Sequence, residues 1–289
     1  MSKLHRQQPV TCAGSEILLR QVQLLEKNRK SWCCNQNPDA LHDFRVAVRR
    51  SRALLGQMKN ELPQVSGFRD ELTWFSEVSG ELRDLDTLQQ ALTDSKSLTS
   101  EVAEEALLAV LKLLASTREK SANRLRPHLE SETCRSFADR WSAELASWSH
   151  NRAAQEALGE VVDRQIDKNL RKLLGKGATL GRDSADDDYH RLRIRGKKLR
   201  YLLEFFADLY PAELVPCLVK KLKKLQDILG RLQDFSVWRG WLKQFQADLL
   251  PEHYQQLDNL FAAQQQRCRK QFARRFSRFV ASAASCKAC

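Results

Sequence analysis

Two segments of the chain carry the same pattern of a histidine followed by basic residues. In each segment, Arg or Lys stands three, seven and ten positions after the histidine. The first set is His42, Arg45, Arg49 and Arg52, and the second set is His190, Arg193, Lys197 and Arg200. Arginine offers a planar fork of donors that matches phosphate oxygens, lysine is a mobile positive charge, and histidine adds a donor whose charge varies near neutral pH. These side chains at this spacing predict a surface that binds anions.

The spacing places each set on one face of a helix, and we call the two sets the first stripe and the second stripe. At about 100° per residue, offsets of three, seven and ten fall within a sector about 80° wide. The opposite face is apolar and should pack into a bundle; it carries Phe44, Val48 and Leu55 in the first segment and Leu192, Leu199, Leu203 and Phe206 in the second. Neighbouring like charges on a helix repel each other. Because few acidic residues interrupt the stripes, an anionic ligand explains them better than a solvated surface.

The elements that must position these stripes are helices. Apolar residues recur every three to four positions, and only 11 Gly and 7 Pro interrupt the 289 residues, which predicts an all-α fold. We expect helices over residues 14–34, from Pro38 with Asn37 as the N-cap, from Pro63 to about Gly80, from Leu82, over 99–127, over 151–174 and over 252–284. A bridging segment is expected over 131–148 and a linker over 175–188, and Pro211, Gly230 and Pro251 should punctuate the remainder.

The two halves of the chain match beyond the stripes. Gly80, Asp84 and Leu88 in the first half correspond to Gly230, Asp234 and Trp238 in the second. Self-similarity at a fixed offset indicates a duplicated unit. We therefore predict two similar helical bundles related by an approximate two-fold axis, over residues 12–149 and 150–283, with 284–289 as a tail. A single large irregular helical domain is the alternative.

Composition favours a polyanionic partner and an intracellular location. The chain has 48 Lys and Arg against 36 Asp and Glu, a net charge of +12, which suits nucleic acid, an anionic membrane or a phosphate polymer. It has neither an apolar signal core near its start nor an apolar run that could span a bilayer, so we expect a soluble, cytoplasmic protein without a membrane partner. The eight cysteines are scattered, which favours reduced thiols. Cys286 and Cys289 form a single CxxC, a weak metal signal without further ligands, and we expect neither a metal nor another cofactor.

The basic segments resemble the CHAD family, whose name stands for conserved histidine α-helical domain. The resemblance rests on HDFRVAVRRSR from His42 to Arg52 and HRLRIRGKKLRY from His190 to Tyr201, and it extends to LRDLD from Leu82 and LKKLQDILG from Leu222. It covers roughly residues 14–280. The absence of an acidic ExExK-type start leads us to expect a CHAD protein without a triphosphate tunnel domain on the same chain.

The resemblance implies a fold, a ligand and a site. The fold is two four-helix bundles with pseudo-two-fold symmetry and a basic central groove or pore. The ligand is inorganic polyphosphate, with recruitment to polyphosphate granules, and phosphate or sulfate ions are expected to fit the same site. The implied binding residues are the eight members of the two stripes together with Arg83 and Lys223. The halves differ, because Gln233 replaces Arg83 in the second half and Thr73 replaces Lys223 in the first.

Two other functions are compatible with parts of the sequence. A helical nucleic-acid binder would use the basic end of the last helix, which contains Arg267, Arg269, Lys270, Arg274, Arg275 and Arg278, but the chain has no zinc finger, homeodomain or RNP-type aromatic motif. An enzyme would use His42 or His190 as a phosphorylated group or general acid, but the chain has no P-loop and no paired metal-binding carboxylates on one helix face. Asp186 to Asp188 are better explained as favourable charges at a helix N-terminus. We therefore expect polyphosphate binding without catalysis.

Overall fold

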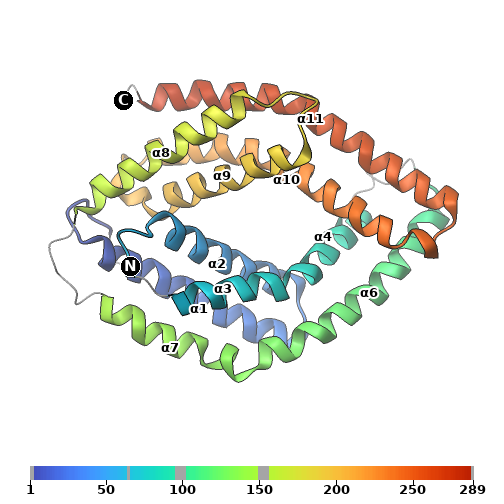
Figure 1. Cartoon of the computed structure of the whole chain (residues 1–289), viewed down its shortest axis with the longest axis horizontal. Helices are drawn as coiled ribbons and strands as arrows, with labels where there is room; N and C mark the ends of the chain where they lie inside the picture. Colours follow the sequence, from blue (N-terminus) through green and yellow to red (C-terminus); the bar gives the residue numbers. More distant parts are fainter. Residues whose placement is uncertain (1–2, 64–65, 95–101, 149–155, 288–289) are drawn as a thin grey trace. The chain divides into compact units, whose positions relative to one another are not determined.

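The computed structural model describes residues 3–63, 66–94, 102–148 and 156–287, and it confirms the all-α prediction. Within these ranges the chain forms α-helices and two short 3-10 helices, and β-pairing is limited to one isolated bridge between Pro9 and Ala157 (Figure 1). The α-helices are α1 (Val10–Asn35), α2 (Pro38–Gln57), α3 (Ser66–Val78), α4 (Gly80–Asp94), α6 (Glu104–Glu130), α7 (Glu132–Trp148), α8 (Leu158–Ala178), α9 (Asp186–Phe205), α10 (Leu214–Gln244) and α11 (Pro251–Lys287). No described helix is long and apolar enough to cross a membrane.

The helix that carries the first stripe begins as the sequence predicts. The side chain of Asn37 accepts a hydrogen bond from the backbone N–H of Asp39 at 2.9 Å, and Pro38 is the first helical residue of α2. Asparagine at the N-cap satisfies a backbone donor that has no partner inside the helix, and proline at the next position needs no partner because it has no N–H. The start of α2, and therefore the register of the first stripe, is set locally.

Several helix boundaries differ from the sequence-based expectation, including the start of α1 at Val10 and not at residue 14. Pro127 lies inside α6, whose last residue is Glu130, because a proline in the last turn removes only one backbone hydrogen bond. The expected bridging segment forms α7, and α8 continues through Gly175 and Gly177 to Ala178. Gly230 lies inside α10. A glycine there lowers the helix propensity by about 1 kcal/mol, but it does not end a helix whose residues before and after it are packed.

The described chain forms two compact units. Unit 1 comprises Met1–Arg83, Ala122–Arg171 and Lys198–Pro216, and unit 2 comprises Asp84–Ser121, Lys172–Lys197 and Cys217–Cys289. Several helices, including α8 and α9, contribute residues to both units. These units describe compactness in space, whereas the predicted division between residues 149 and 150 follows the sequence repeat. That division and its pseudo-two-fold relation stay predictions.

Unit 1 is built on packed aromatic side chains beneath the first stripe. In it α1 packs against α2 and α7, and α2 also packs against α3 (Figure 1). Phe44 of α2, which is fully buried, meets Phe75 of α3 edge to face at 5.5 Å, and Phe75 meets Phe137 of α7 at 4.8 Å. Burying one such ring contributes about 1.5–3 kcal/mol. The apolar face predicted for α2 is confirmed, since Phe44, Val48 and Leu55 are all at most 1% exposed.

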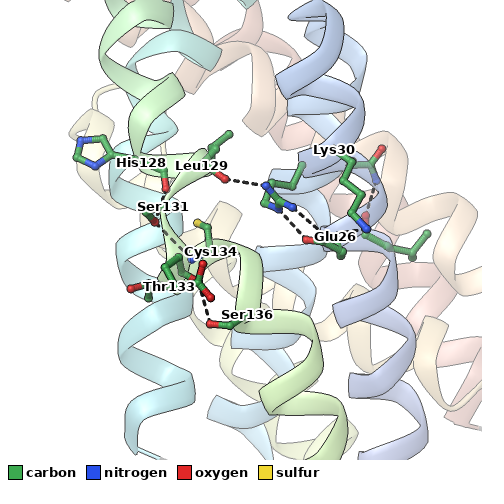
Figure 2. A network of polar contacts seen from close by, with 12 residues as sticks. Glu26, Lys30, His128, Leu129, Ser131, Thr133, Cys134 and Ser136 are labelled. Atoms are coloured by element: carbon green, nitrogen blue, oxygen red, sulfur yellow. Dashed lines mark hydrogen bonds and ion pairs between the residues drawn. The ribbon is translucent and has the colours of Figure 1, made fainter.

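A buried arginine joins α1 to the junction between α6 and α7 in unit 1. Arg29 is 6% exposed; its Nη1 donates to the carbonyl oxygen of Leu129 at 2.8 Å, and its Nε and Nη2 donate to the carboxylate of Glu26 (Figure 2). Lys30 adds an ion pair to the same carboxylate at 3.2 Å. These contacts satisfy the buried guanidinium and lower the pKa of Glu26 against the opposing effect of burial. The site is a structural anchor, because its charge is matched within the chain.

Unit 2 holds His190, Arg193 and Lys197 of the second stripe and the basic end of α11. Tyr189 of α9 meets Phe272 of α11 edge to face at 5.2 Å, and Trp238 of α10 meets Phe261 of α11 at 5.7 Å. Leu192 of α9 is fully buried, as predicted. Leu199, Leu203 and Phe206, the last of which follows the end of α9, lie in the unit 1 part of the chain and are at most 3% exposed. The apolar face of α9 is therefore confirmed along its length.

The cysteines that the structure describes are free thiols. They are Cys12, Cys33, Cys34, Cys134, Cys217 and Cys268. Burial raises the pKa of the Cys134 thiol to about 12, so this thiol stays protonated at neutral pH. Cys286 and Cys289 lie outside the residues whose side chains are described.

Candidate anion-binding site

The first stripe lies on the face of α2 opposite Phe44 and Val48. Its members differ in exposure, since His42, Arg45 and Arg49 are half-buried and Arg52 is exposed. The apolar face holds α2 against unit 1, so the stripe is presented by a rigid helix and not by a loop. The four side chains nevertheless have different surroundings, and they do not act as one uniform surface.

His42 lies in a positive electrostatic environment. Burial is the main effect that lowers its pKa, and the nearby charges of Arg83 and Arg49 lower it further. Asp43 and Asp39 act in the opposite direction but do not cancel these effects. The structure thus brings three of the predicted residues together, from α2 and from the start of α4. Burial alone would lower the pKa of any imidazole, so only the charge effects report on the surroundings: those of Arg83 and Arg49 outweigh those of Asp43 and Asp39.

Arg45 is bound to the end of α3. Its Nη1 donates to the carbonyl oxygen of Ser76 at 2.7 Å and to Oγ of Ser79 at 2.8 Å. Ser79 in turn donates from Oγ to the carbonyl oxygen of Phe75. Arg45 thus donates to a carbonyl group in the last turn of α3, where helices leave carbonyl groups without intrahelical partners, just before α4 begins at Gly80. The sequence pattern predicted Arg45 as an anion-binding residue. The structure shows that Arg45 also holds the junction of α3 and α4, which the pattern did not indicate.

Arg49 and Arg52 carry the least compensated charges of the first stripe. Neither forms an ion pair within the described part of the chain, and Nε of Arg49 is buried there without a hydrogen-bond partner. A buried guanidinium donor without a partner costs free energy. An oxyanion at Arg49 would supply the missing acceptor.

The second stripe has a different partner for its histidine. Nδ1 of His190 forms a short hydrogen bond with Oε1 of Gln233 in α10. With the amide oxygen as acceptor, Nδ1 carries the hydrogen, and Nε2 is the nitrogen left for a ligand. Gln233 occupies the position that Arg83 has in the first half. The neutral amide orients the ring of His190, whereas the charge of Arg83 acts on His42 electrostatically.

The remaining predicted residues are distributed over α9 and α10. Arg193 and Lys197 are half-buried, and Lys223 of α10 is exposed; all three belong to unit 2. Arg200 belongs to unit 1, where its Nε lies 3.5 Å from Oε1 of Glu204 and its guanidinium stands over the ring of Tyr201 at 5.3 Å. Arg200 is therefore partly neutralised and partly held by an aromatic ring.

A clamp from α11 holds the start of α9, one turn before His190. Nη1 of Arg269 donates to the carbonyl oxygens of Arg182 and Ser184, both at 2.9 Å, and Nη2 pairs with Asp186. Asp188 pairs with Lys176 at 2.6 Å, which lowers the pKa of this carboxyl group. The predicted position of these aspartates at a helix N-terminus is confirmed, since Asp186, Asp187 and Asp188 form the first turn of α9, where negative charge is favourable. The sequence analysis assigned Arg269 to a basic surface; it did not indicate this contact, which joins residues more than 80 positions apart.

The carboxylate of Asp86 in α4 has a structural partner. Asp86 is 5% exposed and accepts a hydrogen bond from Nε of Arg118 at 2.6 Å. In the ranges that the structure describes, no group of three or more His, Cys, Asp and Glu side chains is arranged to hold a metal ion. What the described site offers is a set of hydrogen-bond donors and positive charges.

A family model described as the CHAD domain matches residues 16–243 of the chain, which is most of its length. The chain belongs to the CHAD domain family. The matched range includes both stripes, Arg83 and Lys223, and it ends before α11. The resemblance seen in the sequence is therefore confirmed for the family.

Solved structures show the same CHAD fold. The crystal structure of the CHAD domain from the plant Ricinus communis matches with a TM-score of 0.79 at 23% sequence identity, covering 99% of this chain and 94% of that one. PptA from Streptomyces chartreusis matches with a TM-score of 0.70 at 16% identity, covering 95% of this chain and 100% of that one. No curated protein sequence matches the chain. At these identities the likeness concerns the fold.

Proposed function

We propose that this CHAD domain binds inorganic polyphosphate through the two stripes, Arg83 and Lys223. The observation that carries the proposal is the uncompensated charge of the first stripe: Arg49 and Arg52 form no ion pair within the described part of the chain, and Nε of Arg49 is buried there without a hydrogen-bond partner. A binding site for a polyanion holds uncompensated positive charge before the ligand arrives, and a solvated surface does not need to. The family membership supports the same ligand, since the resemblance implies polyphosphate.

The chemistry of polyphosphate fits what the stripes offer. The polymer repeats one kind of charged group and has no bases to read, so a binding surface needs charge and spacing only. Arginine supplies bidentate donors to phosphate oxygens, and lysine and histidine add charge that follows a flexible chain. Binding releases counterions and should weaken steeply with salt, as it does for nucleic acids.

The test removes charge from the stripes while leaving Arg45 in place, because Arg45 also holds the junction of α3 and α4. One variant combines Arg49→Gln, Arg52→Gln and Arg83→Gln, and a second combines Arg193→Gln, Lys197→Gln and Lys223→Gln. A control removes three exposed charges elsewhere, with Lys27→Gln, Lys112→Gln and Arg135→Gln. Each protein is titrated with long-chain polyphosphate by calorimetry at two salt concentrations, with RNA of equal charge as comparator.

We expect each stripe variant to bind long-chain polyphosphate at least tenfold more weakly than the control, and the two sets of substitutions together, in the double stripe variant, to weaken binding further. Circular dichroism should show unchanged helicity. Equal affinity in the stripe variants and the control would contradict the proposed site. Preference for RNA over polyphosphate in the unmodified protein would contradict the proposed ligand.

We also propose that the protein binds the polymer without cleaving it and that it locates to polyphosphate granules in the cytoplasm. Incubation with polyphosphate and Mg²⁺ or Mn²⁺ should release no phosphate above background, and sustained turnover would make the protein an enzyme. A fluorescent fusion should collect at the granules in cells that make them. The double stripe variant should remain diffuse.

A further inference from the structure

The end of α11 carries a second row of positive charge that lies outside both stripes. Its members are Arg267, Lys270, Arg274 and Arg278, and we call them the α11 row. All four side chains are exposed. At about 100° per residue they share one face about 80° wide, and the row extends roughly 16 Å along the helix. The row also lies beyond residue 243, where the match to the CHAD family model ends.

The charge of the α11 row is not neutralised by the chain. From Asn259 to Cys289 the sequence contains no Asp or Glu. Asp258 is paired with Arg239 at 2.7 Å, and Asp186 is paired with Arg269. Over the fully described stretch from 267 to 278, the members of the row form no ion pair. Like charges three and four residues apart destabilise the helix, so a structural role does not explain the row.

The helix dipole does not account for the row either. Cations stabilise a helix only when they lie within its last turn. Arg278 stands more than two turns before Lys287, the last residue of α11. Cations that stabilise α11 through its dipole would lie in the last turn, near Lys287, and not at the positions of the α11 row.

The α11 row is held in place by the buried face of the same helix. Phe272 and Phe276 are stacked with 5.6 Å between ring centroids, and Phe279 is fully buried. Phe276 also packs against Gly177 of α8, where an added Cβ atom would come within 2.1 Å of the ring. A fixed apolar face keeps the four cations at constant spacing, so little order has to be gained when a ligand binds.

A cavity of about 720 Å³ borders the α11 row within unit 2. It is lined by Gln271 and Arg275 of α11 and by residues of α10 that include Lys224, Arg231 and Gln226. Gln226 is 6% exposed, and both its amide nitrogen and its amide oxygen lack a hydrogen-bond partner in the described structure. Asp227 and Asp234 also line the cavity and offset part of its charge. The cavity therefore adds donors beside the row, while the uncompensated charge lies on α11 itself.

The chemistry of the row favours a phosphate polymer over single-stranded nucleic acid. Proteins that bind single-stranded nucleic acid combine positive charge with aromatic side chains on which bases stack. Between residues 267 and 278 the aromatic side chains of α11, Phe272 and Phe276, are both buried. The row offers charge alone, which is what a polymer without bases requires.

We infer that the α11 row is a second polyphosphate-binding surface, separate from the stripes, which lets one long chain engage the protein at two places. This inference rests on the proposed function, because it takes the same ligand. A long flexible polymer that is held at one surface reaches the second at a high effective concentration, whereas a short one occupies only one surface. The row thus makes binding selective for long chains.

The test compares three proteins, the unmodified chain and two variants, with tripolyphosphate and long-chain polyphosphate. It is repeated with RNA of equal charge, and with the double stripe variant before and after the α11 substitutions are added. The α11 variant combines Arg267→Gln, Lys270→Gln, Arg274→Gln and Arg278→Gln. Its matched control removes four exposed charges elsewhere, with Lys27→Gln, Lys112→Gln, Lys120→Gln and Arg135→Gln. Each is titrated with tripolyphosphate and with long-chain polyphosphate over a range of salt concentrations. We expect the α11 variant to bind the long chain at least tenfold more weakly than the control, with tripolyphosphate binding at the stripes unchanged. The log–log salt slope for the long chain should fall by roughly three.

Four outcomes separate this inference from the proposed function. If the double stripe variant still binds the long chain, and adding the α11 substitutions removes that binding, the second surface is supported directly. Equal long-chain affinity and salt slope in the α11 variant and the control overturn the second surface, while the stripe variants still test the stripes. Loss of RNA binding with unchanged polyphosphate binding overturns the ligand of the α11 row and assigns it to nucleic acid. If the unmodified protein binds no polyphosphate, both proposals fail.

Discussion

Nη1 of Arg45 lies 2.8 Å from Oγ of Ser79 and donates a hydrogen bond to it, although Arg45 belongs by its spacing to the first stripe. The same nitrogen donates to the carbonyl oxygen of Ser76. Arg45 therefore connects α2 to the junction of α3 and α4. Removing it should affect folding as well as binding.

The first prediction separates these two effects. Arg45→Gln should lower the free energy of unfolding by about 1–3 kcal/mol, because it leaves the partly buried groups of Ser76 and Ser79 without their donor. Arg52→Gln should change it by no more than about 0.5 kcal/mol, since Arg52 is exposed. Urea titrations followed by circular dichroism measure both values. Equal stability of the two variants would show that Arg45 does not hold the junction.

The second prediction concerns acid sensitivity. The pKa of His42 is lower in the folded protein than its ordinary value of about 6.5, so below neutral pH the unfolded chain binds more protons than the folded one at this position. Stability from this group is therefore present above pH 6.5 and is lost as the pH falls through the folded pKa. His42→Gln should lose less stability than the unmodified protein between about pH 7 and pH 5. Denaturant titrations across this range measure the free energy of unfolding at each pH, with His5→Gln as the exposed control. Parallel pH dependence of the unmodified protein and the His42→Gln variant would show that His42 makes no such contribution.

The third prediction couples the proton to the ligand. A polyanion bound beside His42 would counter the charges of Arg83 and Arg49, which lower its pKa. Binding should then be accompanied by proton uptake and should strengthen as the pH falls from 8 to 6. Calorimetry in two buffers of different ionisation enthalpy measures the uptake. The pair His42→Ala and His190→Ala should weaken binding more at pH 6 than at pH 8; the same loss at both values would mean that a charged imidazole is not involved.

The fourth prediction concerns the tautomer of His190. Oε1 of Gln233 accepts a hydrogen bond from Nδ1 of His190. The neutral imidazole should therefore carry its hydrogen on Nδ1 and leave Nε2 open to the ligand. Gln233→Leu removes the acceptor and should increase the population of the other tautomer. Nitrogen chemical shifts of the ring distinguish the two forms, and Gln233→Glu, which keeps an acceptor, is the conservative comparison. An unchanged tautomer in the leucine variant would argue against the orienting role.

The fifth prediction uses two glycines of α8. Gly177→Ala would place a Cβ atom 2.1 Å from the ring of Phe276, whereas an alanine at Gly175 meets nothing within 4 Å. Gly177→Ala should destabilise the protein by about 1–3 kcal/mol through overpacking. Gly175→Ala should stabilise it by up to about 1 kcal/mol through helix propensity. Thermal unfolding should therefore move in opposite directions, and a shared direction would mean that α8 and α11 do not pack closely at Gly177.

The sequence by itself determined the all-α class, the buried faces of α2 and α9, and the family. The apolar spacing that buries Phe44 and Val48 is a local property of one helix, and so is the cap at Asn37, because both depend on residues within a few turns. The position of the basic stripes on the opposite face follows from the same periodicity.

Only the tertiary structure decided how the charges of the stripes are used. Arg45 and Arg49 stand on the same helix face, yet one is bound to the end of α3 and the other adds to the charge around His42, because their partners come from other helices. The same holds for the two glycines at matching positions: Gly80 begins α4 where Arg45 takes up the carbonyl of Ser76, while α10 continues through Gly230. Contacts between residues distant in the chain are set by packing, and periodicity along one helix carries no information about them.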